Sequence, residues 1–245
     1  MSMYKKIQKN VTTYYATLQE QYSAKYVKEV MIGLGLLVAL GGGYMLNRWY
    51  TQHREQKAFE ALCEVVVSFN QTQRATQGLD PAKDQEKIEQ SWNDTLLLLD
   101  ALYKEHMGSY LAPYFLAFKA QVVLEKDHDL AQSMQILDEA LPHMSKNSEL
   151  GSLFHMKRIK MGFDSEDEKV KEQSLHNLME IAQDASSFAQ QEAQYLLGVY
   201  YASQGQVAKA QATWKELVTT ADVVALVKSP WVKLAQEKLG LASQS

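Results

Sequence analysis

This chain of 245 residues has one cysteine, and its histidines are scattered rather than grouped. Its one cysteine, Cys63, excludes an internal disulfide framework, and we expect it to be a small buried apolar residue rather than a reactive thiol. The six histidines include no His-x-x-x-His pair, so the sequence offers no metal-ligand pattern. It also lacks a glycine-rich phosphate loop, a nucleophile elbow and paired carboxylates in a catalytic setting. We therefore expect no enzymatic activity, no metal and no cofactor.

Charge is missing from one long stretch, residues 30–47, which reads VMIGLGLLVALGGGYMLN. A helix of that length is roughly 27 Å long at 1.5 Å per residue, close to the ~30 Å hydrocarbon core of a bilayer. Residue types that settle at a membrane–water interface occur at its end: Tyr44, Arg48, Trp49 and Tyr50. The pattern predicts a single transmembrane helix over residues 30–47.

Two other interpretations of this stretch are less favoured. A buried helix of a soluble fold would rarely contain five glycines, which are unfavourable in such a helix but common in membrane helices. A cleaved signal peptide does not fit the 29 residues ahead of the run, and no plausible mature start follows a small-x-small site. An uncleaved anchor is the better interpretation.

The N-terminal segment, residues 1–29, carries five lysines and two glutamates. Fewer cations follow the apolar run, so the positive-inside rule favours a cytoplasmic N-terminus. Because this segment holds +3 of the chain's total of −4, residues 30–245 carry −7, which argues against nucleic-acid binding. The segment either lies along the membrane and attracts anionic lipids, or is a helical extension that enforces orientation.

Residues 48–80 are expected to continue the membrane helix as a stalk, because no Pro/Gly/Ser-rich linker interrupts them. Beyond the stalk, residues 81–245 show apolar positions at three- and four-residue steps and no alternating pattern of a sheet. The predicted helices are 82–106, 110–126, 129–144, 148–162, 167–184, 187–204, 206–219 and 229–239. Short turns between such helices indicate an all-α solenoid of stacked hairpins.

The last hairpin carries the sharpest local pattern, which is the tetratricopeptide signature. Its small residues allow two helices to approach closely, its aromatic residues fill the space beside them, and a glycine marks the turn. The residues are Leu197, Gly198, Tyr201, Gly205, Ala210 and Trp214. Earlier helix pairs keep the length of the repeat but only fragments of the pattern.

Two acidic clusters invite a functional interpretation and have a simpler one. The triplet Asp127-His128-Asp129 resembles a metal motif, yet it lies at an expected helix turn where aspartate caps the next helix. Residues 164–168 are either an acidic docking patch or a helix N-terminus whose acids complement the macrodipole, and the second interpretation is favoured.

Two surfaces are candidates for partner binding. Within the predicted membrane helix, Gly35, Ala39 and Gly43 recur every four residues, a spacing that lets another membrane helix approach closely. The second candidate is the groove of the solenoid, which receives peptides or partner domains in such folds. Its candidate residues are Tyr114, Lys119, His155, Arg158 and Gln194.

As a whole, the chain resembles the YfgM-type ancillary subunits of the bacterial Sec translocon. The likeness is carried by GLGLLVALGGGY, by Arg48-Trp49-Tyr50, and by Gly205, Ala210 and Trp214 in the last hairpin. The chain differs in its longer lysine-rich N-terminal segment and in an extra helix near 82–106. The resemblance implies an inner-membrane protein that faces the periplasm, associates with a SecYEG-type translocon and pairs with a PpiD-type prolyl isomerase.

The expected function is therefore that of a non-catalytic, membrane-anchored scaffold for protein partners. One alternative is a structural scaffold of another envelope complex, such as a division or secretion apparatus, with no contact to translocating chains. Another is a regulator whose tyrosine- and lysine-bearing N-terminal segment signals in the cytoplasm.

Overall fold

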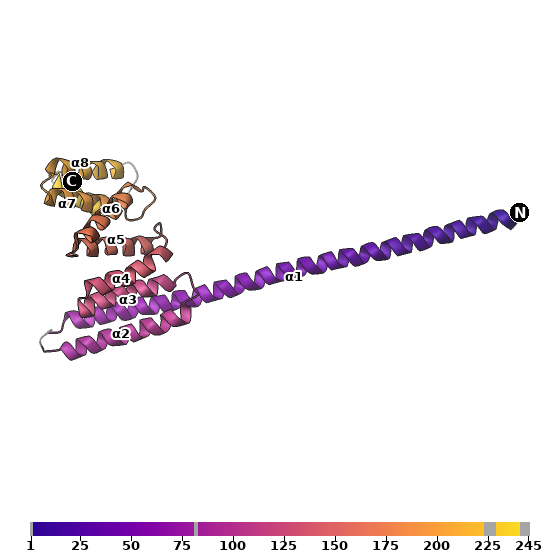
Figure 1. Cartoon of the computed structure of the whole chain (residues 1–245), viewed down its shortest axis with the longest axis horizontal. Coiled ribbons are helices and arrows are strands. Elements are labelled where there is room, and N and C mark those ends of the chain that lie inside the picture. The colour runs from indigo at the N-terminus through magenta and orange to yellow at the C-terminus, as the bar shows by residue number, and fades with distance from the viewer. Residues whose placement is uncertain (1, 81–82, 223–228, 241–245) are drawn as a thin grey trace. The chain divides into compact units, whose positions relative to one another are not determined.

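The computed structural model describes the backbone of residues 2–80, 83–222 and 229–240, and the side chains of residues 40–80, 83–220 and 229–240. All regular structure in these ranges is helical, which confirms the all-α prediction (Figure 1). Each helix predicted beyond residue 80 is present, with ends displaced by a few residues. The elements are α1 Ser2–Gln77, α2 Gln85–His106, α3 Ala112–Asp127, α4 Leu130–Ala140, η1 Leu141–His143 (a 3-10 turn), α5 Glu149–Phe163, α6 Glu168–Gln183, α7 Gln190–Ser203, α8 Val207–Asp222 and α9 Pro230–Lys238.

Contacts divide the chain into two compact units, Met1–Gln56 and Lys57–Ser245. The division falls within α1 and within the predicted stalk, so residues 57–77 of α1 belong to the helical unit. Among the described residues, no helix is long and apolar enough to cross a membrane. Of the span predicted over 30–47, the side chains of residues 30–39 lie outside those described.

Side-chain caps explain where several helices of the second unit begin. Asp129 accepts a hydrogen bond from the Gln132 amide at 2.8 Å at the start of α4. Asp167 does the same for the Lys169 amide at 2.9 Å at the start of α6. The capping interpretation of both acidic clusters is therefore supported, because each provides the acceptor that the first turn of a helix lacks.

The first core extends from α1 to α5, and its N-terminal part lies where α1 meets α2 and α3. Ala58, Leu62, Val65 and Phe69 recur at four- and three-residue steps along α1 and are buried. The Phe69 ring lies 5.6 Å from Trp92 of α2 and 6.0 Å from Phe118 of α3, measured between ring centroids. The C-terminal part of α1 is thus an integral element of the helical unit.

The expectation that Cys63 is buried is wrong, because this thiol is exposed. Consecutive helical residues are about 100° apart, so Cys63 follows buried Leu62 but points away from the stripe that packs into the core. It lies on the same face as Phe59 and Val67, which are also exposed.

Two smaller cores follow along the helical unit. Each helix packs mainly against its neighbours in sequence, as Figure 1 shows. The second core joins α5, α6 and α7, with fully buried Leu178 and Ala193 near its centre. The third joins α7, α8 and α9 around Trp214, Leu217 and Val232. Such nearest-neighbour packing is typical of helical-repeat architectures.

Candidate partner-binding surfaces

The hairpin of α7 and α8 brings the residues of the repeat signature together. A Cβ placed on Gly198 would lie 2.6 Å from Cδ1 and 2.7 Å from Cε2 of Trp214, so only glycine leaves room for the indole. The indole Nε1–H donates to the Tyr195 carbonyl oxygen at 3.1 Å, and Ala210 is buried beside it. Leu197 and Tyr201 are partly buried against the second and third cores.

Gly205 ends α7 in the left-handed region, with a φ of 70°. The Gln206 amide donates to the Tyr201 carbonyl at 2.9 Å across this turn. A residue with a Cβ is strained at this φ, which accounts for the glycine in the signature.

The structure does not gather the five candidate groove residues on one surface. Tyr114 and Gln194 are buried, and the Tyr114 hydroxyl lies 3.2 Å from Ser148 Oγ. Lys119 donates to Asp100 of α2 at 2.7 Å. Only His155 and Arg158, one turn apart on α5, line the same hollow.

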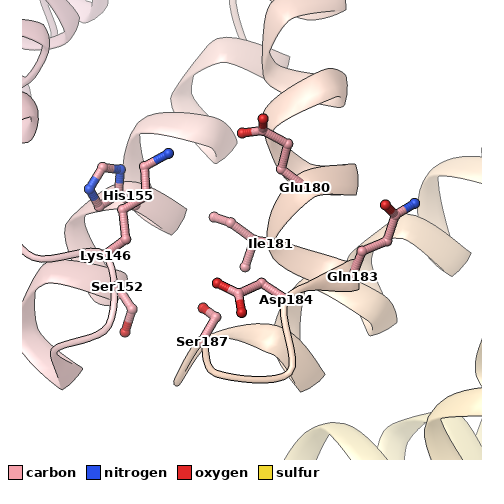
Figure 2. A pocket seen from close by; sticks show the side chains of 8 residues that line it. All are labelled: Lys146, Ser152, His155, Glu180, Ile181, Gln183, Asp184 and Ser187. Carbon is pink, nitrogen blue, oxygen red and sulfur yellow. The ribbon is translucent and has the colours of Figure 1, made fainter.

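That hollow is part of a polar groove bordered by α4, α5 and α6, with volumes of about 440 and 410 Å³ in its two sections. Figure 2 shows one section, in which Glu180 and Asp184 lie across from Lys146 and His155. Arg158 forms a bidentate pair with Asp138 of α4, at 2.8 and 2.9 Å, so its charge is neutralised within the groove.

His155 has the most unusual environment in this groove. Its buried Nε2 has no hydrogen-bond partner among the described residues. Burial, with a smaller contribution from the positive charge of Lys146, lowers the pKa of His155. Burial therefore favours the neutral form of the imidazole over the charged form.

A second furrow, between α5 and α7, was missed by the sequence analysis. Its first hollow, of about 520 Å³, is lined by Glu149, Leu150, Ser152, Leu153, Phe188, Ala189 and Glu192. Its second, of about 490 Å³, is lined by Lys160, Phe163, Asp164, Lys171, Leu196, Val199, Tyr200, Ser203 and Gln204. The apolar residues of this furrow are visible in the sequence, but nothing in the sequence distinguishes them from the apolar residues of the core.

The aromatic and cationic residues expected at the membrane interface are all exposed on α1. Trp49 stacks on His53 one turn later, with ring centroids 5.8 Å apart. Gly43 has open space around it in the described part of the chain. Gly35 and Ala39 lie in α1, but outside the residues whose side-chain surroundings are described.

No group of three or more His, Cys, Asp or Glu side chains that could hold a metal ion is found among the described residues. Comparison with protein-family models, with curated proteins and with solved structures gives no match to this chain.

Proposed function

We propose that this chain is a single-pass membrane protein with no catalytic role, whose helical unit binds partner proteins. By resemblance, the partners are a SecYEG-type translocon and a PpiD-type prolyl isomerase, and the helical unit faces the periplasm. The proposal combines the apolar character of the first unit with the hairpin packing of the second.

The observation that carries the membrane assignment is a continuous set of exposed apolar side chains at the end of the predicted span. Each is 63–74% exposed: Leu40, Tyr44, Met45, Leu46, Trp49 and Tyr50. They lie on all sides of α1, since consecutive residues such as 44, 45 and 46 point about 100° apart. Large exposed apolar patches mark contacts with a membrane or another protein, and a covering on all sides favours lipid.

The scaffold assignment is supported by the architecture of the helical unit. Its helices form hairpins joined by short connections, and three successive cores link them. Each helix packs mainly on its neighbours, so the hairpins leave grooves open between them, and such grooves serve protein recognition in helical-repeat proteins.

The exposed Cys63 provides a direct test of anchoring and orientation, because it is the chain's only thiol and follows the predicted span. In cells with a permeabilised outer membrane, we expect a membrane-impermeant maleimide to modify Cys63. A matched Ser2→Cys/Cys63→Ser variant should react only after the inner membrane is opened. Labelling in the reverse order, or recovery of the chain in the soluble fraction, would contradict the proposed topology.

The double variant Gly35→Leu/Gly43→Leu tests where partners dock. If small residues pack against another membrane helix, larger side chains separate the helices and association is lost. Association is measured by co-purification from membranes in a mild detergent. Unchanged association would place the contact on the helical unit instead.

A further inference from the structure

We draw no further inference here: the strongest candidate, the exposed apolar face that Phe59, Cys63 and Val67 form on α1, carries nothing, because no feature of the described residues shows what covers it.

Discussion

The contact between Gly198 and Trp214 leads to a sharp prediction for Gly198→Ala. The added methyl would lie 2.6–2.7 Å from two indole carbons, whereas carbon atoms in contact are about 3.5–4.0 Å apart, so the ring must move by about 1 Å. Trp214 is buried and its Nε1–H is bonded to the Tyr195 carbonyl, so movement also weakens that hydrogen bond.

The expected magnitude follows from three contributions. Overpacking costs about 1–3 kcal/mol and a weakened hydrogen bond about 0.5–1.5 kcal/mol, while alanine is favoured over glycine in a helix by about 1 kcal/mol. The net loss is about 2 kcal/mol, which lowers the melting temperature of a unit of this size by about 4–8 °C. Thermal unfolding followed by circular dichroism measures the shift.

Two further variants isolate the cause. Gly78→Ala adds a methyl that meets no described atom within 4 Å, so we expect no loss of stability. In a Trp214→Leu background, Gly198→Ala should cost at least about 1 kcal/mol less than in the unmodified chain, because the clashing ring is gone. Equal costs in both backgrounds, or an unshifted melting temperature for Gly198→Ala, would refute the reasoning.

Three other predictions concern residues of the core and the polar groove. Phe154→Ala should lower the free energy of unfolding by about 3–5 kcal/mol, because this ring is buried and its centroid lies 5.3 Å from that of Phe118. Phe188→Ala, at an exposed position, should change the free energy of unfolding by less than about 0.5 kcal/mol. Urea unfolding measures both. Ser133→Ala should cost about 1 kcal/mol in the same assay, because Ser133 Oγ donates to the Ala120 carbonyl at 2.6 Å in a fully buried position and this hydrogen bond is lost. Burial, assisted by Lys146, lowers the folded-state pKa of His155, so below about pH 6.5 the unfolded chain binds the extra proton and the free energy of unfolding falls as the pH falls. Urea midpoints measured from about pH 8 to pH 5 should therefore fall less steeply in His155→Gln than in the unmodified chain. Equal slopes of midpoint against pH in the two proteins would contradict this effect of His155.

The helices and their ends were predictable because local signals determine them. Asp129 and Asp167 each cap the first turn of the helix that follows them. Gly205 adopts the positive φ that the turn after α7 needs. The approach of α7 to α8 was predictable for a similar reason, since a small residue opposite a large one is visible in the sequence.

The binding surfaces were harder to predict because they depend on contacts between distant elements. Tyr114 was expected to line the groove but is buried against Phe154 of α5, and Cys63 was expected to be buried but lies off the packed stripe of α1. The furrow needs Leu153 and Phe188 on adjacent repeats to remain uncovered, and nothing local distinguishes an uncovered apolar residue from a core residue.

The central claim is that this chain is a membrane-anchored scaffold for protein partners at the translocon. Its most direct test is co-purification of the tagged, full chain from membranes in a mild detergent, with quantitative identification of the recovered proteins. We predict that translocon subunits and a periplasmic prolyl isomerase are recovered with the unmodified chain. Their absence, with other envelope proteins enriched in their place, would contradict the claim.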